Sequence, residues 1–381
     1  MNDGIKRDLA AYARSLGFER VGITSSDPLK KEGAFLENWL AQGRAGEMRY
    51  LEDQPERRSQ PAELLPGARS VITLAMNYEP SSGLRPPSPA LPREKAGQSL
   101  ALARRQLGEG ARRAGEGKIA RYAYGPDYHR VIRKRLESLV RYLEAMAPGI
   151  QCRTFVDTGP LLERALAQRA GLGFIGKNTM LITKGLGSWV FLASVVTTLE
   201  LPVDAPDERN CGECRLCIEA CPTEAITAPF ELDPRRCIAY LTIEKDGVLD
   251  EPLREKMGGW VFGCDICQEV CPHNVPSRHP RQWPRGMTIL SEILTIKNEV
   301  EFNEKFAGTS LKRAGRESLI RNACVAAANL GRTDLNGLLQ NLSENDSSPI
   351  VREHAAWALK RLGAPNSSSV PPLSTPNPAR S

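Results

Sequence analysis

The chain has 381 residues, of which 41% are hydrophobic and 25% are charged, and its formal net charge is +6. This length allows two or three domains, and the two fractions are those of an ordinary soluble protein. No apolar run is long enough to cross a bilayer, which excludes a membrane-spanning protein. The small basic excess is compatible with an anionic partner such as nucleic acid, but a solvated surface explains it equally well.

The first 80 residues alternate between helical and extended patterns. Apolar residues recur at helical spacing over residues 4–16, and Gly17 ends that helix. A short strand is predicted over 18–23, a second helix over 35–40, and a buried strand over 69–76. The polar start of the chain has neither the apolar core of a signal peptide nor a twin-arginine pair, so we expect a cytoplasmic protein.

Residues 81–118 interrupt this pattern. They open with S-S-G-L-R-P-P-S-P-A-L-P, and proline lacks a backbone donor and fixes φ, so regular structure is not expected there. Residues 85–118 contain eight Lys or Arg and three Glu. We interpret the segment as a flexible, basic insertion, and a solvated loop is favoured over a dedicated binding arm.

Ordered elements resume after the insertion. They are a helix over 131–146, a strand over 152–157, a helix over 161–170 that Pro160 opens, an apolar stretch over 174–183 and a fully apolar strand over 189–198. The alternation of strands and helices up to about residue 200 predicts an α/β domain over residues 1–204.

Eight cysteines then follow the spacing of iron–sulfur proteins. The first run, C-G-E-C-R-L-C-I-E-A-C-P, has the bacterial ferredoxin pattern, in which three close thiolates bind one 4Fe–4S cluster and the fourth binds the other. The second run, C-D-I-C-Q-E-V-C-P, is altered, because its first cysteine, Cys237, stands far upstream. We therefore expect a ferredoxin-type double-cluster module over 205–285, with a loop or helix after Cys237. The spacing assigns Cys211, Cys214, Cys217 and Cys271 to cluster 1, and Cys221, Cys237, Cys264 and Cys267 to cluster 2.

Structural zinc and disulfides are the alternatives for these cysteines. Zinc would use four ligands in C-x-x-C pairs, whereas here two interlocked runs each end in Cys-Pro. Disulfides need an oxidising compartment, which nothing in the sequence indicates. Two 4Fe–4S clusters are therefore favoured, and they imply a protein that handles electrons at low potential.

The composition changes again after the cysteines. Helices are predicted over 316–330, 335–342 and 349–362, the last with Ser348 as N-cap, Pro349 in its first turn and Gly363 at its end. Two helices followed by V-R-E-H-A-A-W-A-L-K-R-L-G are typical of a HEAT-type repeat, so we expect a HEAT-like helical domain over 286–363. Residues 364–381 are rich in Pro, Ser and Asn and are expected to be disordered.

Several stretches resemble one family. They are A-Y-G-P-D-Y-H at 123–129, V-D-T-G-P-L-L-E-R-A-L-A at 156–167, G-F-I-G-K-N-T-M-L-I at 173–182 and G-C-D-I-C-Q-E-V-C-P at 263–272. Together they resemble epoxyqueuosine reductase, a cobalamin-dependent family that acts in the last step of queuosine modification of tRNA. The resemblance runs from the N-terminus through the cluster module to the C-terminal helices and leaves out the insertion and the tail. It implies a cobalamin in the α/β domain, next to one cluster.

The resemblance also implies roles for single residues. Asp157 matches the proton donor of the family, and its pKa would be raised by desolvation against an apolar macrocycle. Its alternative role is to cap the helix that Pro160 opens, in which case a tyrosine such as Tyr124 is the next candidate donor. The residues that would contact the cofactor are Arg58, Tyr124, Asp157, Met180, Leu181 and Asp265. His129 is not followed by the glycine of the D-x-H-x-x-G motif, so we favour a structural or surface role for it.

The implied substrate is a nucleotide in the anticodon loop of a tRNA. An unstacked loop base can enter a pocket, and phosphate contacts make such binding depend on salt. The candidate contacts are Lys245, Arg278, Arg352, Lys360 and Arg361, although each alone is also compatible with a solvated charge. We further expect an unidentified low-potential electron donor, no membrane partner and a monomer.

Two other functions remain open on the sequence. A reductive dehalogenase also combines a corrinoid with two 4Fe–4S clusters, but such enzymes usually carry a twin-arginine signal and lack HEAT helices. A non-catalytic electron carrier or assembly factor would not need about 200 residues of α/β domain ahead of its clusters. No G-x-G-x-x-G after a strand, Walker loop or H-E-x-x-H motif points to another chemistry.

Overall fold

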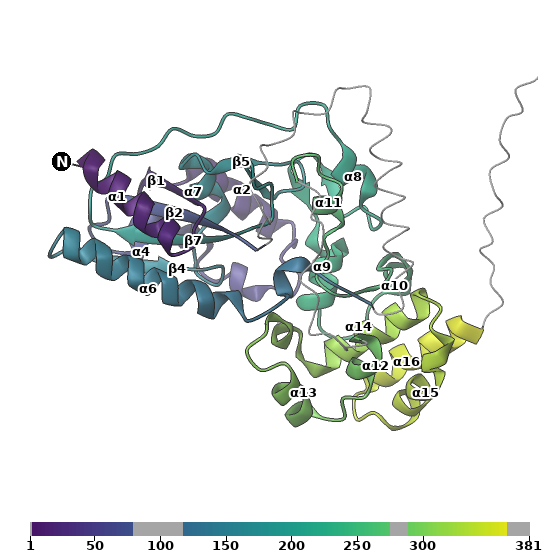
Figure 1. The fold of residues 1–381 in the computed structure, drawn as a ribbon. Helices are drawn as coiled ribbons and strands as arrows, with labels where there is room; N and C mark the ends of the chain where they lie inside the picture. Colours follow the sequence, from purple (N-terminus) through teal and green to yellow (C-terminus); the bar gives the residue numbers. More distant parts are fainter. Residues whose placement is uncertain (1, 79–116, 275–288, 364–381) are drawn as a thin grey trace, which may run out of the picture.

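The N-terminal domain is built on a four-stranded sheet in the order β1-β2-β7-β4 (Figure 1). The computed structural model describes residues 2–78, 117–274 and 289–363. The strands are β1 (Arg20–Ser25), β2 (Ser70–Asn77), β7 (Val190–Thr197) and β4 (Cys152–Phe155). The two apolar strands, β2 and β7, pair in the centre over their full length, where helices can cover both of their faces.

All neighbouring strands of this sheet are antiparallel. The domain therefore mixes helices and strands as expected, but it lacks the parallel strands that the α/β class usually contains. The reason is that an alternation of elements in the sequence does not fix strand direction. Between β1 and β2 the chain forms α2 (Lys30–Ala41), α3 (Pro55–Arg58) and α4 (Pro61–Leu64), and then returns antiparallel beside β1 instead of crossing the sheet.

Helices cover both faces of the sheet. On one face lie α1 (Asn2–Ser15) and α6 (Tyr128–Met146). The buried residues of α6 recur every three or four positions and pack with α1 and the sheet, and they are Ile132, Leu136, Leu139 and Leu143. The other face is covered by α7 (Glu163–Arg169) and α4, through a cluster that includes Leu64, Leu166 and Val196.

A small hairpin joins this domain to the cysteine-rich module. Its strands are β5 (Gly173–Ile175) and β6 (Leu181–Thr183), and residues 176–180 form the turn between them. At Gly173 a side chain would lie only 2.3 Å from the carbonyl oxygen of Ile182, so the tight pairing of the two strands requires glycine.

The cysteine-rich module consists of short elements. They are α8 (Leu216–Ala220), β8 (Ile226–Ala228), β9 (Glu231–Leu232), α9 (Ile238–Ile243), α10 (Glu251–Lys256), β10 (Trp260–Phe262) and α11 (Ile266–Glu269). The helices α9 and α10 fill the interval after Cys237, as the sequence predicted. β10 pairs in parallel with β3 (Lys118–Ile119), which ties the module to the segment that leads into α6.

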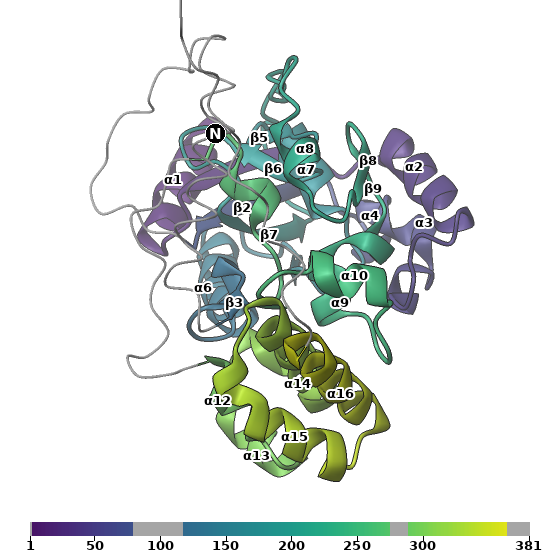
Figure 2. The ribbon, with the colours of Figure 1, turned by 90° about the vertical axis from the view of Figure 1, so that its right-hand side faces the viewer.

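The remaining described helices form a lobe of their own at the bottom of Figures 1 and 2. They are α12 (Ile289–Leu294), α13 (Glu299–Lys305), α14 (Gly315–Asn329), α15 (Asn336–Asn345) and α16 (Pro349–Gly363). The alanine-rich α14 is buried along almost its whole length, which the small side chains allow. Ser348 accepts hydrogen bonds from the backbone N–H groups of Ile350 and Val351, which confirms it as the N-cap of α16. The HEAT-like character of the lobe stays a prediction.

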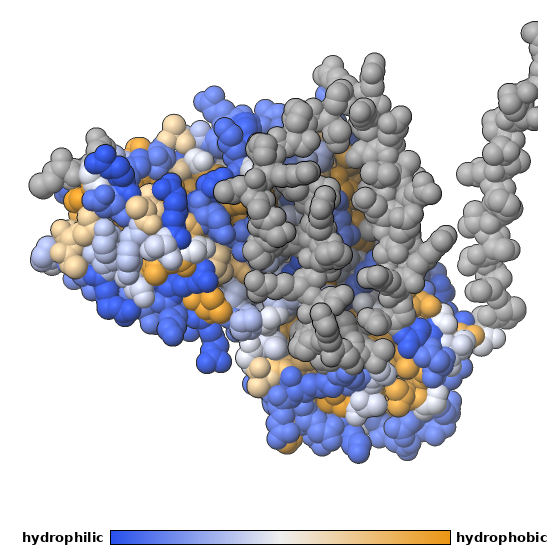
Figure 3. Space-filling model, in the orientation of Figure 1, coloured by the Kyte–Doolittle hydropathy of each residue, from blue (hydrophilic) through white to orange (hydrophobic). Residues whose placement is uncertain are grey.

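The insertion up to residue 116, Arg278 and the tail 364–381 lie outside the described residues. In the part of the chain that is described, no helix is long and apolar enough to cross a membrane. On the face seen in Figure 3, hydrophobic residues are scattered among hydrophilic ones, both on the sheet domain and on the C-terminal lobe.

Candidate iron–sulfur and catalytic sites

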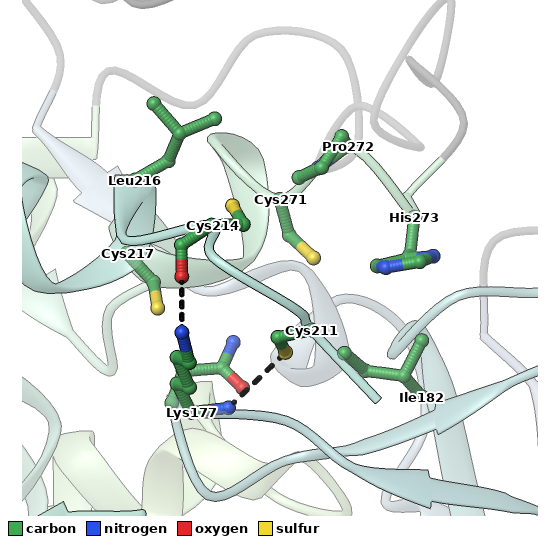
Figure 4. Close-up of a pocket in the computed structure, with 10 residues that line it drawn as sticks. Lys177, Ile182, Cys211, Cys214, Leu216, Cys217, Cys271, Pro272 and His273 are labelled. Atoms are coloured by element: carbon green, nitrogen blue, oxygen red, sulfur yellow. Dashed lines mark hydrogen bonds between the residues drawn. The ribbon is translucent and has the colours of Figure 1, made fainter. Parts of the chain in front are cut away.

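Four cysteines line one cavity of the cysteine-rich module. They are Cys211, Cys214, Cys217 and Cys271, the set that the spacing assigns to cluster 1. Their sulfur atoms surround a common space (Figure 4), with Pro272 and His273 on one side and the turn of the β5–β6 hairpin on another. The loop before α8 supplies the sulfurs of Cys211 and Cys214, α8 itself supplies that of Cys217, and Cys271 follows two residues after the end of α11. A cavity with four converging thiols fits a 4Fe–4S cluster.

Lys177, in the turn of the β5–β6 hairpin, holds the loop of this cavity. Its Nζ donates to the carbonyl oxygens of Gly212 at 2.6 Å and Cys214 at 2.9 Å. Its backbone N–H donates to the Sγ of Cys211 at 3.4 Å. Hydrogen bonds to cluster sulfurs and nearby positive charge favour the reduced, more negative state of a cluster. The adjacent Asn178 donates from Nδ2 to the carbonyl oxygen of Cys267 at 3.3 Å, so the same turn contacts both cysteine sets.

Among the other four cysteines, Cys264 and Cys267 have thiol pKa values that respond to their neighbours. Burial raises the pKa of the Cys267 thiol, and the negative charges of Cys237, Cys217 and Cys221 raise it further. Burial likewise raises the pKa of Cys264, followed by the charges of Cys267 and Cys237. The backbone N–H of Ala225 also donates to the Sγ of Cys221 at 3.3 Å.

Asp157 follows β4 and lies at the centre of a hydrogen-bonded group. Its Oδ2 accepts from the hydroxyl of Tyr128 at 2.8 Å and lies 3.3 Å from Nε2 of His129. Both partners occupy the first turn of α6, where Asp127 caps the helix by accepting from the N–H of His129 at 2.9 Å. The Tyr128 ring stacks on Phe191 of β7 with 4.2 Å between centroids, which fixes its position. The Asp157 side chain is 57% exposed, so it remains accessible to a substrate.

The contacts of Asp157 within the chain act against the raised pKa that the resemblance implies. Burial raises the pKa of the Asp157 carboxyl, but hydrogen bonds from His129 and Tyr128 outweigh burial, and the pKa falls below its ordinary value. For His129, burial lowers the pKa, but the bonds to Asp157 and Asp127 outweigh it and raise the pKa. His129 thus contacts Asp157 directly, while its role, structural or catalytic, stays a prediction.

Glu163 is the carboxyl group with a raised pKa. Its Oε2 accepts from the backbone N–H of Asp157 at 2.8 Å, which closes the loop between β4 and α7. Burial raises the pKa of Glu163 to about 8, and the charge of Asp157 adds to that rise. Its other oxygen, Oε1, is buried and has no hydrogen-bond partner among the described residues. Glu163 is therefore protonated near neutral pH.

Two family models match the chain. Residues 210–274 match the 4Fe-4S double cluster binding domain, and residues 58–158 match "Epoxyqueuosine reductase QueG, DUF1730". The epoxyqueuosine reductase of Xanthomonas campestris is 40% identical over 361 residues, which are 93% of this chain and 95% of the relative. That of Pseudomonas aeruginosa is 40% identical over 367 residues, 94% of this chain and 95% of the relative.

A solved structure agrees with these relatives. It is a crystal structure of epoxyqueuosine reductase with a tRNA-Tyr epoxyqueuosine-modified tRNA stem loop, which superimposes with a TM-score of 0.80 at 32% identity. The match covers 96% of this chain and 92% of that chain. The chain belongs to the epoxyqueuosine reductase family. It is an oxidoreductase. Its double-cluster domain, residues 210–274, contains all eight cysteines predicted to bind iron.

Arg58, Met180 and Leu181, which are also predicted to contact a cofactor, have different surroundings from one another. Arg58 ends α3 and donates from Nη2 to the carbonyl oxygen of Tyr50, and its buried Nε has no partner in the described part of the chain. Met180 is half-buried in the hairpin turn, whereas Leu181 packs among Ala167, Ala170 and Leu172 and belongs to the core.

Tyr124 and Asp265 have contacts of their own within the described chain. Tyr124 packs against the core of the C-terminal lobe, and the tyrosine that contacts Asp157 is Tyr128. Asp265 is 1% exposed and accepts from the backbone N–H of Arg121 at 2.8 Å, which joins the cluster 2 loop to the segment before α6. Their roles toward a cofactor stay predictions.

Four of the five predicted tRNA contacts are among the described residues, on or near the C-terminal lobe. Lys245 pairs with Glu47 at 2.5 Å and Arg361 pairs with Glu255 at 2.5 Å. Arg352 donates to the carbonyl oxygen of Asp346 at 2.6 Å, and Lys360 is exposed on α16. Of these, Lys360 is the cation most accessible to a phosphate.

Sequence reasoning did not identify Tyr128, His129, Glu163 or Lys177 as functional residues. All four stand inside the stretches that carry the family resemblance. The usable signal was Asp127 as the N-cap of a helix, because a cap fixes which residues occupy the first turn.

Proposed function

We propose that this chain reduces epoxyqueuosine to queuosine in the anticodon loop of a tRNA, with two 4Fe–4S clusters and a cobalamin as its redox cofactors. The observation that carries the proposal is the β5–β6 turn, which contacts both cysteine sets and belongs to the domain that holds Asp157. A relative of this chain has been crystallised with an epoxyqueuosine-modified tRNA stem loop, which supports tRNA as the substrate.

The cysteines would hold the two clusters as the spacing assigns them. Cys211, Cys214, Cys217 and Cys271 line one cavity, which supports their assignment to cluster 1. The charge of Cys221 adds to the raised pKa of Cys237 and of Cys267, and that of Cys237 adds to the raised pKa of Cys264, which supports cluster 2. The domain boundaries at residues 204, 285 and 363 follow from this division and are part of the proposal.

The surroundings of Asp157 fit a cobalamin. The Nε of Arg58 and the Oε1 of Glu163 are buried polar atoms without partners among the described residues. A corrin ring carries amide side chains at its rim, and these supply acceptors and donors for such atoms. Arg58, Met180 and Asp157 are the residues that would border it. Cobalamin, when bound, supplies a cobalt centre of low potential that suits a two-electron reduction.

Asp157 would handle the protons of the reaction. Removal of the epoxide oxygen as water consumes two electrons and two protons. The His129 imidazole, whose pKa is raised, would hold the proton, and the Asp157 carboxylate beside it would pass that proton to the leaving oxygen. Tyr128 keeps Asp157 oriented through its hydroxyl.

A relative also supports movement of this loop. A structure of the Bacillus subtilis epoxyqueuosine reductase has its aspartate-bearing catalytic loop swung out of the active site. The corresponding proposal here is that the loop of Asp157 opens to admit the substrate. The bond between Glu163 and the Asp157 backbone would close it again.

The location of the protein in the cell and its partners are part of the same proposal. A tRNA substrate places the protein in the cytoplasm, where we expect it to work as a monomer with an unidentified low-potential electron donor. Lys245, Arg278, Arg352, Lys360 and Arg361 remain the proposed tRNA contacts.

The experiment that tests this function analyses tRNA from cells that lack the protein. We expect epoxyqueuosine to accumulate and queuosine to reappear when the intact gene is returned. The visible spectrum of the purified protein should contain iron–sulfur absorption together with corrin bands. Normal queuosine in the deletion strain, or a spectrum without corrin bands after loading with cobalamin, would overturn the proposal.

A further inference from the structure

The helix α14 of the C-terminal lobe donates hydrogen bonds into the cysteine-rich module. Two adjacent residues of α14, Arg321 and Asn322, are both 0% exposed. The Arg321 guanidinium donates from Nη2 to the carbonyl oxygen of Leu241 at 2.8 Å, and from Nη1 to those of Lys245 and Gly247 at 2.8 and 2.7 Å. A cation on the last carbonyls of a helix satisfies its free acceptors and complements its dipole. Arg321 thus fixes the C-terminal end of α9.

Asn322 connects α9 with β10. Its Nδ2 donates to the carbonyl oxygen of Thr242 in α9 at 2.8 Å and to that of Val261 in β10 at 2.9 Å. Its Oδ1 accepts from Nη2 of Arg321 at 3.0 Å, so the two side chains act as one unit. Thr242 adds a second link between the same segments, because its Oγ1 accepts from the backbone N–H of Gly263 at 2.9 Å.

These two segments carry cysteines of one cluster. Cys237 is the residue that begins α9, and its carbonyl oxygen accepts from the N–H of Leu241 within the first turn. Cys264 directly follows Gly263 and is the third residue after Val261. The bonds of Arg321 and Asn322 therefore set the distance between the two backbone segments from which these thiols project.

We propose that Arg321 and Asn322 are positioning residues for cluster 2, so that the C-terminal lobe is part of the cluster site. The inference rests on the proposed assignment of Cys221, Cys237, Cys264 and Cys267 to that cluster. Cys237 stands apart from the compact cysteine runs in the sequence. Its position relative to the other ligands therefore depends on contacts outside those runs, such as the hydrogen bonds from α14. The cluster 1 cysteines have no such contact with α14 among the described residues, since their loop is held by Lys177.

The decisive variant is Asn322→Leu, which keeps a similar volume and removes both donors. We expect the iron content of the anaerobically purified protein to fall from about eight toward about four per chain. The electron paramagnetic resonance signal of cluster 1 should remain. Cys267→Ala provides the reference spectrum of a chain with cluster 1 alone. If Cys267→Ala keeps all its iron, the assignment of the cluster 2 cysteines is wrong. If Cys267→Ala loses iron and Asn322→Leu does not, the assignment holds and only the positioning role is wrong.

Arg316→Met is the matched control in the same helix. Arg316 is also buried, but it bonds to the carbonyl oxygen of Ile296 and to Asp346, both inside the C-terminal lobe. We expect this variant to melt at a lower temperature and to keep both clusters. Equal iron loss in Arg316→Met and Asn322→Leu would mean that general destabilisation, and not positioning, removes the cluster.

Arg321→Lys decides the question if Asn322→Leu does not fold. Lysine retains the charge but cannot reach all three carbonyl oxygens at once. We expect a folded protein in which the signal shape and midpoint potential of cluster 2 change while those of cluster 1 do not. Unchanged signals and potentials for both clusters would overturn the inference.

Discussion

Asp157 holds a backbone conformation that few residues other than glycine adopt. Its φ is +55°, in the left-handed region, where Asp and Asn are the best tolerated of the other residues. The conformation turns the carboxyl toward Tyr128 and His129, which come from a different element. Asn at this position would keep the backbone, the size and the acceptor for Tyr128, so substitution isolates the acid function.

For Asp157→Asn we expect a folded protein that retains both clusters but loses at least about a hundredfold in rate, the usual scale for removal of a general acid. The rate should be measured by single turnover with pre-reduced enzyme, so that electron supply does not limit it. If Asp157 served only to hold Tyr128 in place, and not to cap α7, whose N-cap is Leu162, the amide would serve equally well and the rate would stay within a few-fold. That result would move the proton-donor role to Tyr128 or His129.

Glu163 predicts a pH dependence of stability. The pKa of a free glutamate is about 4.3, and burial raises that of Glu163 to about 8 in the folded chain. The folded state therefore binds the proton more tightly, so the contribution of Glu163 is complete below pH 4.3 and is lost as the pH rises toward 8. Wild type should lose stability relative to Glu163→Gln by on the order of 1 kcal/mol per pH unit in this window.

Thermal melting of the two proteins at pH 5.5, 6.5 and 7.5 measures this difference. Gln cannot ionise but can still accept from the backbone N–H of Asp157, so the loop keeps its bond. The melting temperatures of wild type and variant should diverge as the pH rises. Parallel curves would show that Glu163 ionises normally in the folded protein.

At the scale of elements, the β5–β6 hairpin links the catalytic domain with both cysteine sets. Lys177→Met removes a positive charge beside cluster 1 and two hydrogen bonds to its loop. The midpoint potential of cluster 1 should become more negative, because the reduced cluster loses a stabilising charge. A redox titration followed by electron paramagnetic resonance measures the shift.

Lys184→Met is the control for this hairpin. Lys184 is exposed just after β6 and is absent from the residues that line the cluster 1 cavity. Its replacement should leave both potentials unchanged. A potential of cluster 1 that is equally insensitive to Lys177→Met would mean that the ammonium group only fastens the loop.

The elements also show where sequence reasoning succeeds. The cysteine sets were predictable because a cluster demands thiols at fixed spacing, and the major helices were predictable from apolar periodicity and caps such as Ser348. The antiparallel direction of the strands was not predictable, because it depends on the path that each connection takes between two strands. Neither was the meeting of Asp157 with His129, since only tertiary packing brings β4 and α6 together.

At the scale of the whole molecule, the basic residues proposed for tRNA binding divide into paired and accessible ones. Affinity for a substrate stem loop should fall as salt rises, because contacts to phosphates release counterions. Lys360→Gln should make the slope of log K against log salt shallower by about 0.7, the value for one contact to a single strand. A binding titration by fluorescence anisotropy at several salt concentrations measures the slope.

Lys245→Gln is the comparison for that measurement. Lys245 already pairs with Glu47, so its replacement should change the slope less than Lys360→Gln does. Affinity that stays flat between low and moderate salt would count against a basic docking surface altogether.

The brace from α14 has a consequence for synthesis of the protein. All eight cluster cysteines leave the ribosome before Arg321 and Asn322 are translated. A nascent chain can therefore present Cys237 and Cys264 as free thiols while the groups that align them do not yet exist. If Arg321 and Asn322 position the ligands of cluster 2, as we infer, we expect iron–sulfur delivery to cluster 2 only after these residues are made, and oxygen or a competing metal ion would reach the thiols most easily before then.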